Sequence, residues 1–150
     1  DSDELGEIGL YGALAAEFGV PVLMVSGCDL TALEAKECLP GVECAIVKWS
    51  DGARSGRSLS PAQSRERIQS LARRCVEDAR TSHYGKRPPG KRNAPLTLRV
   101  QCQTPALADV FALWPAVQRV DADTVSVACA SVQDAVRSLN ALSAMSSVMR

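Results

Sequence analysis

The first sixty residues alternate between helical and strand patterns of apolar positions. Apolar side chains recur every four residues at Leu10, Leu14 and Phe18, which predicts a helix around them. The continuously apolar run at residues 21–27 predicts a strand that is covered on both faces, and residues 43–49 predict the next buried strand. A second helical stretch separates these runs. Helix, strand, helix and strand in this order predict the α/β class, with a parallel or mixed sheet and flanking helices.

Two helix starts carry capping signals. Thr31 followed by Glu34 has the form of a capping box, in which Thr31 is the N-cap and Glu34 reaches back to it. Ser60 and Gln63 have the same spacing and predict the start of a third helix. The polar, glycine-containing segment 50–59 before that helix predicts a loop.

The pattern changes after a stretch that is rich in proline, glycine and charge. Residues 96–102 alternate strictly between apolar and polar, as in a strand with one exposed face. A short helical stripe, a hairpin around residues 121–123 and a helix capped by Ser131 follow. We therefore expect a small α+β layer made of strand, helix, hairpin and helix.

These patterns divide the chain into three parts. Residues 1–82 form the predicted α/β part, residues 83–95 the linker and residues 96–150 the small α+β subdomain. The chain begins at Asp1 and opens directly onto a patterned segment, so we expect it to be part of a longer protein.

The bulk composition argues against several function classes. Lys and Arg together number 17, as do Asp and Glu, so no global charge attracts nucleic acid or an anionic membrane. Aromatic residues make up 4%, too few for a base-stacking platform. No apolar run has the length of a membrane span. Six cysteines occur without the Cys-x-x-Cys spacing of a zinc knuckle or redox motif. Five of them stand where an apolar residue would fit a strand or helix pattern, which favours buried, reduced thiols in a cytoplasmic protein.

The segment Gly27-Cys28-Asp29 is a candidate site, because ligands collect beyond the carboxyl ends of the strands in α/β sheets. Asp29 could bind a ligand, support one through a hydrogen bond, or cap the next helix, and the cap is the favoured interpretation. Cys28 needs a base to act as a nucleophile, and the one histidine, His83, lies in the linker. One histidine cannot complete a catalytic zinc site, so no catalytic residue is assigned in this chain.

Five short motifs stand in order between residues 6 and 61. They are GEIGL at 6–10, GVPVLMVSGCD at 19–29, EAKECLPGVE at 34–43, VK at 47–48 and RSLSP at 57–61. The set resembles the zinc-dependent D-aminopeptidase family of bacterial dipeptide metabolism, and the likeness continues more weakly to the last helix. It covers nearly the whole chain, but only the C-terminal half or so of a family member.

The resemblance implies a metallo-aminopeptidase that hydrolyses amino-terminal peptide bonds in peptides of D-amino acids. It implies two zinc ions held by Asp, Glu and His ligands, with Glu7 matching the glutamate of the Gly-Glu-x-Gly-Leu motif. The family's other ligands and its catalytic histidine precede Asp1, so we expect an incomplete metal site and an inactive isolated chain. The family also implies a homo-oligomer that acts on a peptide substrate. The competing interpretation of Glu7 is structural, as a first-turn carboxylate that interacts with the helix dipole.

Two positions depart from the family pattern near the expected site. Tyr11 stands where the family usually has asparagine, and Cys28 stands within a motif that is usually Gly-Asp-Asp. Together with Asp29, these residues are candidates for contacts with substrate or for support of the metal ligands. The departures favour one alternative, a non-catalytic relative that serves as a binding or oligomerisation module. A second alternative is an unrelated α/β domain that binds a small anion through its basic linker.

Overall fold

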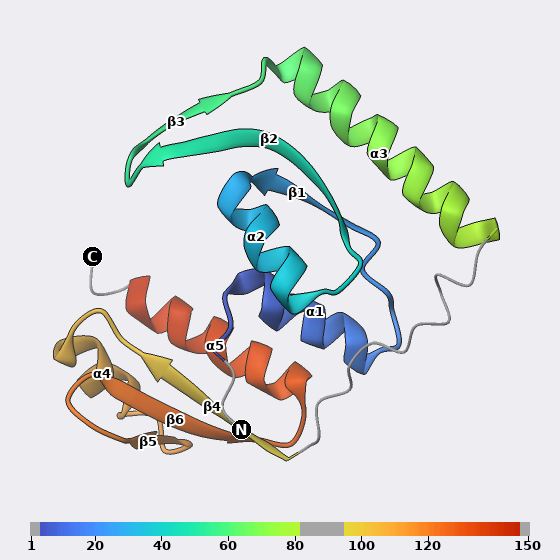
Figure 1. Ribbon diagram of the computed structural model, residues 1–150. Helices are drawn as coiled ribbons and strands as arrows, with labels where there is room; N and C mark the ends of the chain where they lie inside the picture. The colour runs from blue at the N-terminus through green and yellow to red at the C-terminus, as the bar shows by residue number, and fades with distance from the viewer. Residues whose placement is uncertain (1–3, 82–94, 148–150) are drawn as a thin grey trace. The chain divides into compact units, whose positions relative to one another are not determined.

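The computed structural model describes residues 4–81 and 95–147 of the chain. The chain divides into an N-terminal unit, Asp1–Lys91, and a C-terminal unit, Arg92–Arg150, and each is described by itself (Figure 1). The predicted linker, apart from its last residue, lies outside the described residues, and so does His83.

A three-stranded sheet forms the centre of the N-terminal unit. Its strands are β1 (Met24–Cys28), β2 (Glu43–Gly52) and β3 (Ser55–Ser58), in the order β1-β2-β3. β1 and β2 run parallel with Met24 opposite Glu43, whereas β2 and β3 run antiparallel. The predicted α/β class with a mixed sheet is therefore confirmed, although β1 is shorter than the apolar run that predicted it.

Three helices flank this sheet, α1 (Glu7–Glu17), α2 (Asp29–Cys38) and α3 (Pro61–Thr81). α2 and α3 lie on opposite sides of the sheet, and α1 packs on α2 (Figure 1). Successive residues of β2 show this division. Cys44 points toward α2, where its thiol contacts the Ala32 carbonyl oxygen at 3.9 Å, and Ala45 packs in a core cluster with residues of α3.

The capping box predicted at the start of α3 is confirmed. The Gln63 N–H donates to Ser60 Oγ at 3.3 Å, and the Ser60 N–H donates to Gln63 Oε1 at 3.2 Å. Leu71 and Cys75 are the buried residues of this helix.

The capping box predicted at Thr31 and Glu34 is wrong. α2 begins three residues earlier than predicted, at Asp29, and its N-cap is Cys28, whose Sγ accepts a hydrogen bond from the Thr31 N–H at 3.4 Å. Cysteine is not a preferred N-cap residue, so this start has little signal in the sequence. Glu34 is free to act elsewhere, and it accepts a hydrogen bond from the Gly9 N–H at 3.3 Å.

The buried face of α1 also differs from the predicted stripe. Gly9, Gly12 and Ala16 are the buried residues, whereas Leu14 is half-buried and Phe18 is 61% exposed. Small residues on this face let α1 approach α2 closely, which a stripe of leucines would prevent.

The loop predicted over residues 50–59 is wrong as well. β2 continues to Gly52 and returns as β3, with Arg57 and Asp51 paired across the hairpin at 3.1 Å. All four residues of β3 are exposed, so neither face buries apolar side chains and no alternation marks the strand.

The C-terminal unit has the predicted order of strand, helix, hairpin and helix. Its elements are β4 (Leu96–Gln101), α4 (Pro105–Phe111), β5 (Val117–Arg119), β6 (Thr124–Cys129) and α5 (Val132–Ser146). The antiparallel sheet has the order β4-β6-β5, and its core includes Val125 and Leu142, which are almost fully buried. Ser131 caps α5, since its Oγ accepts a hydrogen bond from the Asp134 N–H at 3.0 Å.

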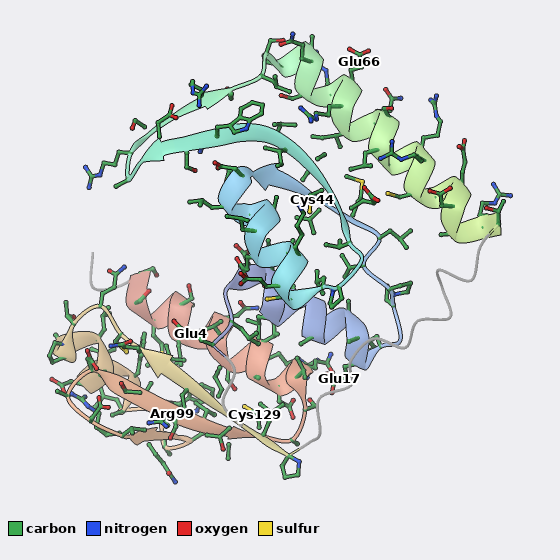
Figure 2. The ribbon with its side chains drawn as sticks, viewed as in Figure 1. Glu4, Glu17, Cys44, Glu66, Arg99 and Cys129 are labelled. Carbon is green, nitrogen blue, oxygen red and sulfur yellow. The ribbon has the colours of Figure 1, made fainter. Side chains whose placement is uncertain are left out.

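All six cysteines lie within the described residues, and none of them forms a disulfide. Cys75, Cys102 and Cys129 are buried, and the other three are half-buried. Figure 2 labels Cys44 in the N-terminal unit and Cys129 in the C-terminal unit. Within the described residues, the length and hydropathy of the helices leave no candidate for a membrane-spanning helix.

Candidate functional site

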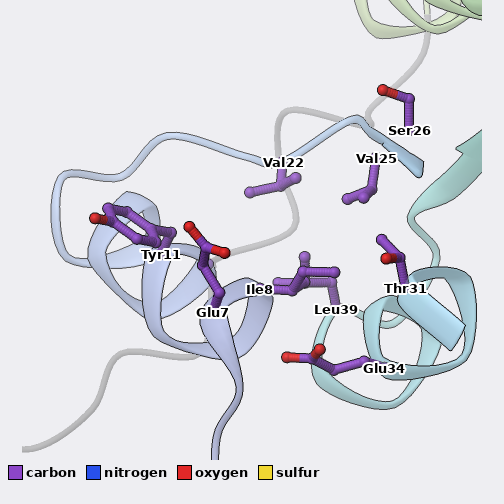
Figure 3. A pocket seen from close by; sticks show the side chains of 10 residues that line it. Glu7, Ile8, Tyr11, Val22, Val25, Ser26, Thr31, Glu34 and Leu39 are labelled. Atoms are coloured by element: carbon purple, nitrogen blue, oxygen red, sulfur yellow. The ribbon is translucent and has the colours of Figure 1, made fainter. Parts of the chain in front are cut away.

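A pocket of about 490 Å³ lies in the N-terminal unit, where α1, the approach to β1 and α2 meet (Figure 3). Ten residues line it: Glu7, Ile8, Tyr11, Gly12, Val22, Val25, Ser26, Thr31, Glu34 and Leu39. Most of these side chains are apolar, and two of them are carboxylates. A mostly apolar hollow with a few polar groups is typical of a site for a small molecule or peptide.

Two of the four candidate residues, Glu7 and Tyr11, lie in this pocket. They stand four residues apart on α1, which places both side chains on one face of the helix. Figure 3 shows both projecting from the same helix at the pocket. Both residues are exposed, Tyr11 by 45%, so each can be reached by a ligand.

Glu7 lies in the first turn of α1. Gly6 is the N-cap, with an extended backbone at φ −79° and ψ −170°, and Glu7 is the first residue of the helix. A carboxylate in the first turn interacts favourably with the positive end of the helix dipole. The placement of Glu7 is thus compatible with the structural interpretation as well as with metal binding.

Asp29 lies at the junction of β1 and α2 and does not line the pocket. Its Oδ1 accepts hydrogen bonds from the Ser50 N–H at 3.0 Å and the Leu30 N–H at 3.1 Å. These backbone donors, Ser50 first, hold the pKa of the Asp29 carboxyl below its usual value. The favoured interpretation of Asp29 as the helix cap is wrong, because Cys28 is the N-cap. Asp29 instead ties the start of α2 to β2.

Cys28 is half-buried and also does not line the pocket. Its Sγ lies 3.2 Å from Thr31 Oγ1 and accepts the Thr31 N–H at 3.4 Å. The contacts with Thr31, its side chain first, lower the pKa of the Cys28 thiol to about 7. Thr31 lines the pocket, so the side chain of Thr31 separates Cys28 from it.

Glu34, like Thr31, lines the pocket although sequence reasoning assigned it to a capping box. It faces α1 from α2, and its Oε1 accepts the Gly9 N–H at 3.3 Å. No signal within α2 could reveal this, because donor and acceptor are 25 residues apart.

The described residues do not form a complete metal site. Among residues 4–81 and 95–147, no three His, Cys, Asp or Glu side chains lie close enough together to hold an ion. Glu7 offers a carboxylate in an accessible pocket, which is suitable chemistry for a zinc ligand. The Glu34 carboxylate already accepts a backbone hydrogen bond. A single carboxylate supplies one or two oxygens, so zinc would need further ligands from elsewhere.

Comparison with known proteins identifies the class. The profile of a family described as D-aminopeptidase matches residues 1–141, so the chain belongs to the D-aminopeptidase family. This confirms the resemblance that the ordered motifs indicated.

Two relatives show how far the likeness extends. A D-aminopeptidase of Bacillus subtilis (strain 168) is 43% identical over 60 residues, which are 40% of this chain and 22% of that protein. The solved structure of the Zn-dependent D-aminopeptidase DppA from Bacillus subtilis, a self-compartmentalizing protease, matches with a TM-score of 0.84 at 23% identity. That match covers 97% of this chain and 52% of the other, so the chain spans about half the length of its solved relative.

Proposed function

We propose that this chain forms one wall of the active site of a zinc-dependent D-aminopeptidase, with Glu7 as a metal ligand. The observation that carries the proposal is the position of Glu7 in a chain of the D-aminopeptidase family: it opens a helix and lines the pocket. The reaction is hydrolysis of the amino-terminal peptide bond of short peptides that contain D-amino acids.

The chain's own residues contribute binding and orientation. Ile8, Val25 and Leu39 give the pocket an apolar lining suited to the side chain of a small peptide. Tyr11 brings a phenol to the same face of α1 as Glu7, within reach of a bound substrate. Zinc bound at such a site supplies Lewis-acid polarisation of the scissile carbonyl and activation of a water molecule.

The remaining ligands come, in this proposal, from residues outside the described ones. Two zinc ions need several anionic or imidazole ligands, and Glu7 can provide only one carboxylate. The 150-residue chain by itself should therefore bind zinc weakly and hydrolyse nothing.

The proposal includes a closed homo-oligomer in the cytoplasm. The solved relative is described as self-compartmentalizing, which is the basis for expecting a closed assembly. None of the six cysteines, all of them described in the structure, forms a disulfide, as is usual for proteins of a reducing compartment.

The test uses the protein expressed from its complete reading frame. We expect zinc-dependent hydrolysis of D-alanyl dipeptides in preference to L-alanyl dipeptides. Glu7→Gln keeps the size of the side chain and removes its charge, and should weaken zinc affinity by more than about tenfold and lower kcat with it. Zinc content after dialysis and turnover by the two variants give the result.

A matched control separates metal binding from charge alone. Glu66 is exposed on α3 and does not line the pocket (Figure 2), so Glu66→Gln should leave zinc content and kcat unchanged. If Glu7 only interacts with the helix dipole, Glu7→Gln costs at most about 0.3–1 kcal/mol of stability and metal content stays the same. That outcome, or a zinc-loaded protein that cleaves no D-alanyl peptide, overturns the proposal.

A further inference from the structure

The first turn of α1 is capped by a side chain from another helix. The first N–H groups of any α-helix lack partners within the helix, and a side chain at the N-cap usually accepts one of them. Here the N-cap is Gly6, which has no side chain to offer. Glu34 of α2 takes that place, because its Oε1 accepts the N–H of Gly9, the third residue of α1, at 3.3 Å.

The carboxylate of Glu34 also lies directly against the backbone of Gly6. A Cβ added at Gly6 would lie 2.8 Å from Glu34 Cδ and 2.9 Å from Oε2, closer than real Cβ contacts come. The absence of a side chain at Gly6 is therefore what admits the carboxylate. Gly6 and Glu34 are thus in close contact at the start of the helix turn that carries Glu7.

Glu34 is itself held in place through the start of α2. Asp29, the first residue of that helix, accepts the Ser50 N–H from β2 at 3.0 Å. Cys28, its N-cap, accepts the Thr31 N–H at 3.4 Å. These contacts fix α2 to the end of the sheet, and the contact of Glu34 with Gly9 carries that constraint to the first turn of α1.

We propose that Glu34 is a positioning residue for Glu7: by capping α1 from α2, it fixes the helix turn that presents the Glu7 carboxylate to the pocket. The inference rests on the proposed function, in which Glu7 binds zinc. Glu34 acts through the backbone of α1, and its Oε1 is engaged by the Gly9 N–H. Its negative charge near the N-terminus of α1 adds a favourable interaction with the helix dipole.

The test measures zinc affinity of the complete protein by competition with a chromophoric chelator. Glu34→Ala removes the cap and should weaken zinc affinity by about 10–100-fold, as the loss of a group that supports a metal ligand does. Glu34→Gln keeps an oxygen that can accept the Gly9 N–H and should restore most of the affinity. Glu37 is exposed on the same helix and does not line the pocket, so Glu37→Ala controls for the loss of a carboxylate from α2.

Thermal melts in excess chelator complete the design. A purely structural role for Glu34 would lower the melting temperature of the apoprotein and leave the zinc affinity of the folded protein equal to that of Glu37→Ala. That result overturns the positioning role. If Glu34→Ala does not fold, Gly6→Ala decides instead, because its Cβ displaces the same carboxylate; full zinc affinity in Gly6→Ala overturns the proposal, and a matching loss supports it.

Glu7→Gln is measured alongside and distinguishes the two proposals. Weakened affinity in Glu7→Gln with full affinity in Glu34→Ala sinks only the positioning role. Unchanged zinc affinity in Glu7→Gln would show that Glu7 is not a metal ligand, and both proposals would then be overturned.

Discussion

At the scale of single residues, the junction of β1 and α2 gathers backbone donors around two acidic groups. Cys28 Sγ accepts the Thr31 N–H, and Asp29 Oδ1 accepts the N–H groups of Leu30 and Ser50. Hydrogen bonds to the charged form favour that form, so both pKa values are lowered, that of Cys28 chiefly by the Thr31 side chain and that of Asp29 chiefly by the Ser50 N–H. The thiol, with a pKa of about 7, is substantially ionised at neutral pH.

This predicts selective alkylation of Cys28. Iodoacetamide should label it with a rate that rises with pH through a midpoint of about 7, whereas the ordinary value for a thiol is 9.0. Thr31→Val removes the hydroxyl whose contact is the largest cause of the lowered pKa, and should move the midpoint toward the ordinary value. Labelling followed by peptide mass spectrometry, with Cys28→Ser as the control, measures the midpoint. A Cys28 midpoint that Thr31→Val leaves unchanged would contradict the assigned cause.

The lowered pKa values of Cys28 and Asp29 also determine how the stability of the fold changes with pH. The folded-state pKa of Cys28 lies below its unfolded value, so its stabilising contribution is fully present above the unfolded pKa and is lost as the pH falls through about 7. For Asp29, whose folded-state pKa is also lowered, the contribution is present at neutral pH and is lost in acid, as the pH falls through that pKa. The Asp29→Asn variant should therefore show a weaker loss of stability in acid than the parent, as denaturant melts at neutral and acid pH would reveal.

Residues whose role depends on near neighbours in the chain could be predicted, and residues whose role depends on packing could not. Ser60 and Ser131 cap helices through contacts three residues away, which the sequence displays directly. Glu7 and Tyr11 share a face because of the helical period alone. Glu34 contacts Gly9 only once α1 has packed on α2, and local spacing suggested a different role for it.

At the scale of elements, the packing of α1 on α2 depends on glycine. A Cβ on Gly12 would lie 2.6 Å from Leu39 Cδ2, and one on Gly9 would lie 3.1 Å from Cys38 Sγ at the end of α2. In an exposed helix glycine is less favourable than alanine, by roughly 0.5–1 kcal/mol. In α1, close packing therefore favours glycine, whereas helix propensity favours alanine. The glycines on the buried face show that packing prevails.

A double-mutant cycle at Gly12 and Leu39 tests this balance. Gly12→Ala alone should destabilise the unit by about 1–3 kcal/mol, because the added methyl overpacks the contact with Leu39. In a Leu39→Ala background the same change should become neutral or stabilising by up to about 1 kcal/mol, since the space is open and only helix propensity remains. Urea denaturation of the four proteins gives the coupling. Equal effects of Gly12→Ala in both backgrounds would show that Leu39 does not limit the approach of the helices.

The hairpin of β2 and β3 shows which elements cannot be predicted from the periodicity of apolar residues. Its second strand is exposed at every residue, and the antiparallel pairing from Lys48–Ser58 onward defines it. Strands with a buried face, such as β4, alternate in sequence and were predicted. A strand held by backbone pairing without burial leaves no such signal.

At the scale of the whole chain, the two units have separate cores of different size. The core cluster of the C-terminal unit contains nine buried residues, whereas that of α3 and the sheet in the N-terminal unit contains three. The fold class was predictable because helical and strand patterns of apolar positions extend over most of each unit. The complete zinc site was not, because Glu7 is the single ligand that the resemblance assigns to this chain.

The separate cores predict separate responses to a cavity. Leu142 is 1% exposed in the core of the C-terminal unit, so Leu142→Ala should destabilise that unit by about 2–5 kcal/mol. The chain contains two tryptophans, Trp49 on β2 and Trp114 packed against the C-terminal core, so each unit has its own fluorescent reporter. In a Trp49→Phe background, urea melts should show a large shift of the transition that Trp114 reports. In a Trp114→Phe background, the transition that Trp49 reports should move much less.

Leu113 is 78% exposed in the same unit, so Leu113→Ala is the matched control and should change stability by less than about 0.5 kcal/mol. Equal shifts of both transitions in Leu142→Ala would mean that the two units unfold as one cooperative body, and the account of two independent cores would have to be abandoned.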